Sequence, residues 1–461
     1  MKQKTKSDIL LDSVKRIHMI GIGGSGMYPI AEILHSEGYI LSGSDNNETD
    51  TLARVRALNI PVTMGHFEQN VEGADLVIYS AAIMKTNPEL VAAEKLGIPT
   101  MERSKALGAI TRRYNNVIGV CGTHGKTTVS SMITQILVEN DFDPSAVIGG
   151  RLPLINSNGR AGESDIMVCE SCEYVDTFLQ LSPDVCVLLN IDCDHMEYFK
   201  TLERLMQSFT QFANSAHTVI VNGNDENSLK AMETVDKNII TYGITDNCDY
   251  YAANIKGGTK TAGEYDLMYK GQLLCHVVLN VPGDHNISNS VAAAAAAHVT
   301  GATGEQIASS LANFKGAGRR FEILGTVDGI TIADDYAHHP KELEVTLKSA
   351  MKMGYNKVYA VFQPFTFSRT KLLLDDFASV LQIADQAVLS EIMGSREINT
   401  YGIHTTDLVE KIPGAVWFDS FEKIADYIVE NAKDGDLVIT LGCGDIYKAA
   451  KIMLKKLKGE C

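Results

Sequence analysis

Short apolar runs recur along this chain, and most of them end in a glycine-rich or acidic turn that leads into a longer helical pattern. The first run, 16–20, meets a glycine-rich turn, and residues 28–38 then carry apolar side chains at helical spacing. Further runs end near Asp45 and Ile83, and residues 87–97 again show a helical pattern. Strands that alternate with helices are typical of a parallel, doubly wound sheet. The pattern therefore predicts an α/β fold.

The same order of elements starts three times, which predicts three α/β domains at 1–114, 115–317 and 318–461. The second block opens with "NNVIGVCGTHGKTTVSSMITQILVEN" and the third with "GRRFEILGTVDGITIADDYAHHP". Within the second block, shorter alternating runs over 240–282 favour a small antiparallel patch. The alanine-rich stretch "VAAAAAAHV" that follows predicts a buried helix packed closely against a sheet.

Composition excludes several classes of partner. The chain has 461 residues with 41 basic and 57 acidic side chains, a formal net charge of -16, so we expect no nucleic-acid partner. No apolar run reaches the roughly 18 residues of a membrane span, and the first residues do not resemble a signal peptide. We therefore expect a cytoplasmic protein with no membrane partner, and the sequence leaves monomer and dimer open.

The nine cysteines lie mostly in apolar segments, which favours reduced, buried thiols. Cys169 and Cys172 form one C-x-x-C pair. A zinc site would need a second pair or two histidines at matching spacing, and the sequence has neither. We interpret this pair as core packing rather than as a metal or redox site.

The first glycine-rich turn has the spacing Gly21-x-Gly23-x-x-Gly26. Glycines at these positions let backbone N–H groups approach a pyrophosphate at a helix N-terminus, and Asp45 could hold a ribose hydroxyl. Three interpretations stay open: a nicotinamide cofactor, another molecule that carries a diphosphate, or a tight turn without a ligand.

A second anion-binding turn is "GTHGKTT", which follows an apolar run and opens a helix. This context is the one that a phosphate loop requires, although Val120 stands where the usual pattern has its first glycine. Lys126 would reach the β- and γ-phosphates, the Thr127 hydroxyl would bind Mg²⁺, and backbone N–H groups would surround the phosphates. The motif predicts binding of ATP or GTP.

Polar side chains follow the next two apolar runs of the second block. The third block adds two candidate groups, one at 319–322 and 334–340 and one at Arg369. Carboxyl ends of parallel strands line the ligand crevice, so the acids after the two runs predict a Mg²⁺ site. The segments 319–322 and 334–340 would reach the nucleotide or form a salt bridge between domains, and Arg369 could clamp a carboxylate. The strand-end residues are Glu170, Glu173, Asn190, Asp192, Asp194 and His195.

Taken together, the motifs resemble those of the Mur ligases, the ATP-dependent amino-acid ligases of peptidoglycan synthesis. The resemblance extends from about Ile17 to Tyr447 and rests on "GIGGSGM", "GSD", "NPE", "GTHGKTT", "NIDCDHMEYF", "GDHNISNSVAA", "RRFE", "DDYAHHP", "FQPFTFSRT" and "LGCGDIY", in the family's order. It implies an N-terminal Rossmann-like domain that binds a UDP-sugar, a central phosphate-loop ATPase with a parallel sheet, and a C-terminal Rossmann-like domain.

The resemblance also implies the reaction and its substrates. In the branch that carries a histidine inside "GTHGKT", ATP phosphorylates the carboxylate of UDP-N-acetylmuramate. The amine of L-alanine then attacks the acyl phosphate, and a tetrahedral intermediate collapses to amide and phosphate. A carboxylate is a poor electrophile, so phosphorylation supplies the leaving group, and catalysis depends largely on positioning and charge neutralisation.

Residue roles follow from the same resemblance. Lys126 would stabilise the phosphoryl group in transfer, Thr127 and Glu173 would hold one Mg²⁺, and His195 a second. His338 and Arg369 would lie near the amino acid. The other implied nucleotide contacts are Gly122, Thr123, His124, Gly125, Thr128, Asn190, Asn289 (on adenine), Arg320 and Asp335. The implied UDP-sugar contacts are Gly21, Gly23, Gly24, Ser25, Gly26, Met27, Asp45 and His66.

Two positions depart from the family's usual pattern. Phe365 replaces a histidine beside the implied amino-acid site, and Cys172 replaces an aspartate before Glu173. Three alternatives therefore stay open: a recycling ligase that adds a tripeptide to UDP-N-acetylmuramate, a nicotinamide-dependent oxidoreductase, and an inactive binding paralogue.

Overall fold

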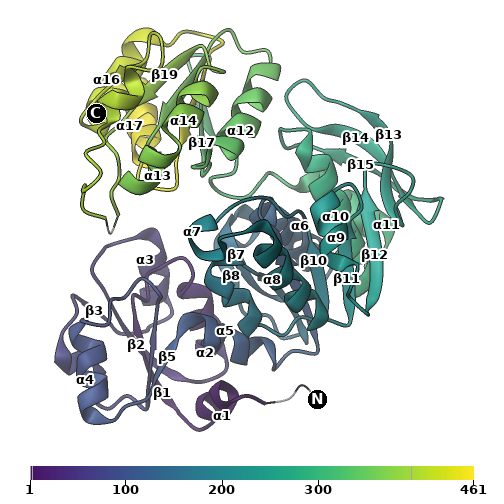
Figure 1. Cartoon of the computed structure of the whole chain (residues 1–461), viewed down its shortest axis with the longest axis vertical. Coiled ribbons are helices and arrows are strands. Elements are labelled where there is room, and N and C mark those ends of the chain that lie inside the picture. Colours follow the sequence, from purple (N-terminus) through teal and green to yellow (C-terminus); the bar gives the residue numbers. More distant parts are fainter. Residues whose placement is uncertain (1, 3, 396, 461) are drawn as a thin grey trace. The chain divides into compact units, whose positions relative to one another are not determined.

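The computed structural model describes residues 2, 4–395 and 397–460 of the chain. Its elements belong to two compact units (Figure 1). The first unit contains the residues up to 255 together with 265–278 and 287–314, and the second contains 256–264, 279–286 and the residues from 315 onward. None of the helices in the described part of the chain has the length and hydrophobicity needed to cross a bilayer.

The first unit begins with a five-stranded sheet in the order β3-β2-β1-β4-β5. All four strand pairs are parallel, so the carboxyl ends of the strands meet at one edge, and β1 lies between β2 and β4 where the strand order reverses. Its strands are β1 (Arg16–Ile20), β2 (Ile40–Asp45), β3 (Val62–Met64), β4 (Leu76–Tyr79) and β5 (Thr100–Glu102). The helices are α1 (Lys6–Asp12), α2 (Tyr28–Ser36), α3 (Asp50–Ala57), η1 (Glu68–Val71), α4 (Pro88–Leu96) and α5 (Arg103–Thr111).

A ten-stranded sheet follows, in the order β15-β14-β13-β12-β11-β10-β6-β9-β7-β8. In the order of the sheet, the strands β13-β12-β11-β10-β6-β9-β7 pair in parallel. Among the pairs with a described register, only β8 is antiparallel to its neighbour, β7. The strands are β6 (Asn116–Cys121), β7 (Ser145–Leu152), β8 (Ser157–Arg160), β9 (Ile166–Glu170), β10 (Val185–Leu188), β11 (Thr218–Asn222), β12 (Asn238–Gly243), β13 (Tyr250–Lys256), β14 (Gly263–Tyr269) and β15 (Gln272–Leu279).

Eight helices accompany this sheet, and the alanine-rich one is buried as expected. Every residue of 291–297, in α10, has no exposed surface, because alanine lets the helix backbone approach its neighbours closely. The antiparallel patch expected over 240–282 is wrong for β12 and β13, which pair in parallel. It holds for the neighbours β14 and β15, because a connection of only two residues, 270–271, allows antiparallel pairing alone, and these strands extend the large sheet. The helices are α6 (Lys126–Glu139), η2 (Pro153–Ile155), η3 (Tyr174–Gln180), α7 (Met196–Phe199), α8 (Leu202–Asn214), α9 (Glu226–Met232), α10 (His285–Thr300) and α11 (Gly304–Asn313).

The second unit holds a six-stranded sheet in the order β16-β17-β21-β18-β19-β20, parallel except for β16. Alternate residues of β18 belong to two different apolar clusters, so helices cover both faces of the sheet. The strands are β16 (Glu322–Val327), β17 (Ile330–Asp335), β18 (Val358–Phe362), β19 (Gln386–Leu389), β20 (Val416–Trp417) and β21 (Leu437–Leu441). The helices are α12 (Pro340–Lys352), α13 (Phe367–Leu372), α14 (Leu374–Leu381), α15 (Thr405–Val409), α16 (Phe421–Asn431) and α17 (Tyr447–Leu457).

The cysteines that the structure describes are all free thiols. Cys169 is buried on β9, as the core-packing interpretation expects, but Cys172 and Cys193 are exposed. The expectation of buried thiols is therefore wrong for these two residues. Both lie in loops that follow a strand, where the chain leaves the core.

Candidate active site

The phosphate loop predicted at 122–127 has the expected setting, since it joins the carboxyl end of β6 to the first turn of α6. Gly125 has a φ of 88°, and a Cβ there would lie 2.8 Å from Oδ1 of Asn289 on α10, so a larger residue is excluded by both strain and contact. Val120 is fully buried within β6 and pairs with β9 and β10. The position where the usual motif has its first glycine thus lies within the strand, and the loop begins at Gly122.

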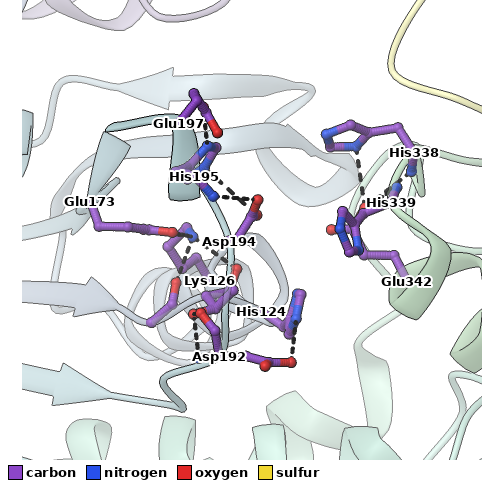
Figure 2. Close-up of polar contacts among 12 residues, drawn as sticks. His124, Lys126, Glu173, Asp192, Asp194, His195, Glu197, His338, His339 and Glu342 are labelled. Atoms are coloured by element: carbon purple, nitrogen blue, oxygen red, sulfur yellow. Dashed lines mark hydrogen bonds and ion pairs between the residues drawn. The ribbon is translucent and has the colours of Figure 1, made fainter. Parts of the chain in front are cut away.

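A segment after β10 holds the phosphate loop in place (Figure 2). The side chain of Asn190 accepts a hydrogen bond from the His124 N–H at 2.8 Å and donates one to the His124 carbonyl at 3.0 Å. The Thr123 N–H donates to the Asn190 carbonyl at 3.0 Å, and the Asp192 N–H donates to the Thr123 hydroxyl at 2.9 Å. Nε2 of His124 lies 3.7 Å from a carboxylate oxygen of Asp192. The loop is therefore preorganised by strand-end contacts.

Asn190→Ala should raise the KM for ATP by about 30-fold, because two hydrogen bonds, each worth about 1 kcal/mol, would no longer fix the His124 peptide. Steady-state kinetics at varied ATP would measure the change, with the exposed Asn214→Ala on α8 as the matched control. An unchanged KM for ATP in Asn190→Ala would show that the loop keeps its shape without this side chain.

Lys126 lies at the first position of α6 and is paired with a buried carboxylate, as Figure 2 shows. Its ammonium is 2.9 Å from Oε2 of Glu173, which is 1% exposed, and it also donates to the carbonyls of Gly122 and Thr123. Burial alone would lower the pKa of Lys126, but the Glu173 carboxylate outweighs it and raises the pKa above its ordinary value. The site therefore holds a permanent cation at a helix N-terminus, which suits a phosphate ligand.

A second acid, Glu170, holds the next helix residue. The Thr127 hydroxyl donates to Oε1 of Glu170 at 3.1 Å, and the Gly149 N–H donates to Oε2 at 2.7 Å. A Cβ at Gly149 would lie 2.4 Å from this carboxylate, so the glycine on β7 makes room for it. Glu170, which the resemblance did not assign as a ligand, is thus the carboxylate in direct contact with Thr127.

His195 precedes the short helix α7 with a left-handed backbone at φ 55°. Its ring lies between acids, since Nε2 is 3.7 Å from Asp194 and Nδ1 is 3.6 Å from Glu197 (Figure 2). The Tyr174 ring packs against it with centroids 4.8 Å apart. A left-handed histidine is uncommon and marks a constrained loop. The segment after β10 that supports the phosphate loop therefore also carries an imidazole with carboxylate neighbours.

The donor atoms of this region suit Mg²⁺ more than a transition metal. Among the described residues, no group of three or more His, Cys, Asp and Glu side chains is arranged to hold a metal ion by itself. Mg²⁺ in nucleotide sites instead takes one or two protein oxygens and completes its shell with phosphates and water. The hydroxyl of Thr127 and the carboxylates of Glu170 and Glu173 fit that requirement.

The first glycine loop lies at the carboxyl edge of the five-stranded sheet, after β1. The N–H groups of Gly21 and Ile22 donate to the Ser44 carbonyl, and the Gly23 N–H donates to Oδ2 of Asp45 at 2.9 Å. Asp45 also accepts from the Asn47 N–H through Oδ1 at 3.0 Å. Asp45, which the sequence suggested as a ribose ligand, is thus a support of the loop in this structure.

Ser25, Gly26 and Met27 continue this loop into α2. Met27 is 1% exposed and belongs to the core, and the Ser25 carbonyl accepts a hydrogen bond from the amide of Asn158 on β8. A Cβ at Gly26 would lie 3.2 Å from a guanidinium nitrogen of Arg103, at the start of α5. The structure therefore adds a cation beside the loop.

The four predicted site residues of the second unit lie on its own strand ends. Both oxygens of Asp335 accept backbone N–H groups at 2.7 Å, from Phe321 and Ala337, and Arg320 stacks on the Tyr336 ring. Nδ1 of His338 is 3.2 Å from Glu342. Arg369 is the third residue of α13. Burial raises the pKa of the Cys443 thiol to about 12, although the positive charge of the nearby Arg369 opposes this rise.

Burial of Asp335 makes the stability of the second unit depend on pH. Burial raises the pKa of this carboxyl to about 6, against 3.8 for an ordinary aspartate. Between these two pH values the unfolded chain loses the proton first, so stability falls as pH rises from about 4 to about 6, by about 3 kcal/mol from this group. Asp335→Asn should remove this part of the slope.

Urea unfolding followed through Trp417, the one tryptophan of the chain, tests this prediction, because β20 belongs to the same sheet as Asp335. The exposed Asp376→Asn on α14 is the matched control and should keep the slope of the unaltered chain. A slope that is identical in Asp335→Asn and the unaltered chain would contradict the assignment.

Family models match the chain along most of its length. The Mur ligase family catalytic domain matches residues 16–115, the Mur ligase middle domain 120–297, and the Mur ligase glutamate ligase domain 319–444. The chain belongs to the Mur ligase family. A protein named UDP-N-acetylmuramate–L-alanine ligase from Caldanaerobacter subterraneus is 39% identical over 98% of this chain and all of the relative. A protein of the same name from Agathobacter rectalis is 42% identical over 95% of this chain and 98% of the relative.

Solved Mur ligase structures have the same fold. UDP-N-acetylmuramate–alanine ligase MurC from Thermotoga maritima has a TM-score of 0.83 and 26% identity, over 97% of this chain and all of that one. A murein peptide ligase from Psychrobacter arcticus has a TM-score of 0.75 and 22% identity, over 96% of this chain and 98% of that one, which shows the fold alone. The expected α/β Mur ligase fold is thus confirmed.

For this Mur ligase, the structure brings together Lys126, Thr127, Glu173 and Asn190, which the sequence selected, and places Asn289 against Gly125. Sequence reasoning missed the loop-holding role of Asn190 and the position of Arg103. It selected Glu170 as one of the strand-end acids but did not place it against Thr127. Glu170 carried a signal, since an acid ends the strand that precedes Glu173. Arg103 carried none, because its neighbour Gly26 lies far away in the chain.

Proposed function

We propose that this chain joins L-alanine to the carboxylate of UDP-N-acetylmuramate at the expense of ATP, in the cytoplasmic synthesis of peptidoglycan precursors. The observation that carries the proposal is the identity of 39–42% to proteins of that name along nearly the whole length of both chains. The phosphate loop with its paired lysine supports the use of ATP.

The proposed reaction has two steps. A carboxylate oxygen of the muramate takes the γ-phosphoryl group of ATP, releasing ADP. The amine of L-alanine then adds to the acyl carbon, loses a proton, and expels phosphate to leave the amide. Lys126 would neutralise charge on the phosphoryl group in transfer, and the loop N–H groups fixed by Asn190 would orient it. We assign Lys126, His195, His338 and Arg369 to the catalytic set.

We further propose that Mg²⁺ accompanies ATP, held by Thr127 and Glu173, with a second ion at His195. A bound Mg²⁺ would supply positive charge that offsets the negative charge of the reacting groups. The remaining assignments follow the family motifs. The domains are 1–114 for the UDP-sugar, 115–317 for ATP and 318–461 for the amino acid. ATP contacts come from Gly122–Thr128, Asn190, Asn289, Arg320 and Asp335, and UDP-sugar contacts from Gly21–Met27, Asp45 and His66.

A substrate panel tests the function. The enzyme, Mg-ATP and UDP-N-acetylmuramate are incubated with L-alanine, glycine, L-serine or the tripeptide, and phosphate release and product mass are measured. We expect turnover with L-alanine. Release of phosphate with the tripeptide alone would establish the recycling ligase instead, and no release with any amine would point to an inactive paralogue. Phe365→His, repeated on the same panel, shows whether this departure changes the KM for the amino acid.

A further inference from the structure

A buried carboxylate lies beneath the first glycine loop, outside the ATP site. Glu89, at the second position of α4, has no exposed surface. Oε2 accepts from the Ser44 hydroxyl at 2.7 Å and from Nδ1 of His66 at 2.9 Å. Oε1 accepts from the Asn70 amide at 2.6 Å and lies 3.4 Å from Nε2 of His18. Four donors from four different elements thus converge on one carboxylate.

These contacts keep Glu89 ionised. Burial alone would raise the pKa of Glu89, but hydrogen bonds from His18, Asn70 and Ser44 outweigh it, so the pKa lies below its ordinary value. The N-terminus of α4, where Glu89 lies, also favours a negative charge. An ionised carboxylate only accepts hydrogen bonds, so each neighbouring imidazole must present an N–H to it.

The cluster is joined to the glycine loop through β2. The carbonyl of Ser44, whose hydroxyl binds Glu89, accepts from the N–H of Gly21 at 2.8 Å and of Ile22 at 3.2 Å. His66 follows β3 at the carboxyl edge of the sheet, and its side chain is 13% exposed, against 2% for His18. Among the described residues, no hydrogen-bond partner contacts Nε2 of His66. His66 is therefore the member of the cluster that can reach a ligand.

We propose that Glu89 is a positioning residue that holds His66 as the Nδ1–H tautomer, so that its Nε2 accepts a hydrogen bond from the sugar nucleotide. The inference rests on the proposed function for the identity of that nucleotide. The diphosphate offers only acceptors, so the donor is the uracil imide N–H, a hydroxyl of the ribose or of the muramate, or the acetamido N–H. When a carboxylate accepts the N–H of one ring nitrogen, the other nitrogen is left as an acceptor, as in metal-binding histidines whose distal N–H is held by a carboxylate.

Nitrogen-15 NMR of the unaltered protein, with labelled histidine, tests the tautomer directly. We expect the His66 signals of a neutral ring protonated at Nδ1 at pH 8, assigned by their loss in His66→Ala. A ring protonated at Nε2 would overturn the proposal. This measurement needs no variant of Glu89 to fold.

Kinetics test the action through His66. Glu89→Gln replaces an obligate acceptor by a group that also donates, and should raise the KM for UDP-N-acetylmuramate about five- to tenfold while kcat and the KM for ATP stay near those of the unaltered enzyme. Glu94→Gln, the same change on the exposed side of α4, is the matched control. In a His66→Ala background, Glu89→Gln should raise this KM no further. An equal rise in both backgrounds would overturn the proposal.

Substrate analogues that each lack one donor identify the group that His66 binds. The set removes the uracil imide N–H by methylation at N3, each ribose and muramate hydroxyl by deoxygenation, and the acetamido N–H by replacement with an ester. The KM penalty of one analogue should disappear in His66→Ala, which identifies the donor, whereas penalties that persist for every analogue would overturn the inference. Absence of turnover with UDP-N-acetylmuramate by the unaltered enzyme would instead refute the proposed function, whatever the tautomer of His66.

Discussion

Lys126→Ala is expected to lower the rate of ligation by about 10³-fold or more, while the affinity for UDP-N-acetylmuramate stays near that of the unaltered enzyme. Lys126 is the ammonium at the start of α6, and its contacts to Glu173 and to two loop carbonyls fix it where a phosphate would bind. The expected loss is large because the phosphate loop, 122–128, contains no second lysine and no arginine.

Phosphate release and product formation at saturating substrates measure this effect, and calorimetry measures the affinity for UDP-N-acetylmuramate. Lys230→Ala, an exposed change on α9, is the control for loss of a lysine. Lys126→Met keeps the apolar stem and shows whether the loss comes from the charge or from packing. Turnover near normal in Lys126→Ala would refute the phosphate-loop assignment.

Glu173→Gln should lower kcat by about 10²-fold and raise the Mg²⁺ concentration that gives half-maximal activity. The carboxylate is almost fully buried and pairs with Lys126, so its neutralisation removes both the partner of that cation and one proposed metal ligand. Loss of one member of a buried ion pair also leaves the other charge uncompensated, so we expect a lower Tm.

Activity titrated against Mg²⁺ at fixed ATP distinguishes the two roles of Glu173. A fall in kcat with an unchanged Mg²⁺ requirement would contradict the metal assignment and leave only the pairing with Lys126. Glu203→Gln, on the exposed side of α8, should match the unaltered enzyme in both measurements. Thermal unfolding of each variant separates a loss of fold from a loss of chemistry.

Local pattern predicted the elements of this fold well. Apolar runs followed by glycine, an acid or another turn residue marked β1, β6, β9, β10 and β18, because a buried parallel strand must be apolar and must end in a turn. Within the antiparallel patch predicted over 240–282, the parallel pairing of β12 with β13 was missed, since alternating residues indicate a strand but do not show to which neighbour it pairs. The exposure of Cys172 was missed because it depends on where the chain leaves the sheet.

The sequence by itself determined the chemistry: a lysine and a threonine at the start of a helix, a glycine loop after a strand, and acids at strand ends. Only the tertiary structure decided which polar side chains become hydrogen-bond partners. His124 and Asn190 are 66 residues apart in the chain, and His18 and Glu89 are 71 apart. The first pair meets because the neighbouring parallel strands β6 and β10 end at one edge of a sheet, and the second because α4 packs on the face of the sheet that contains β1. Residue spacing records the period of a single strand or helix, whereas the partner of a buried polar group depends on the order of strands in the sheet.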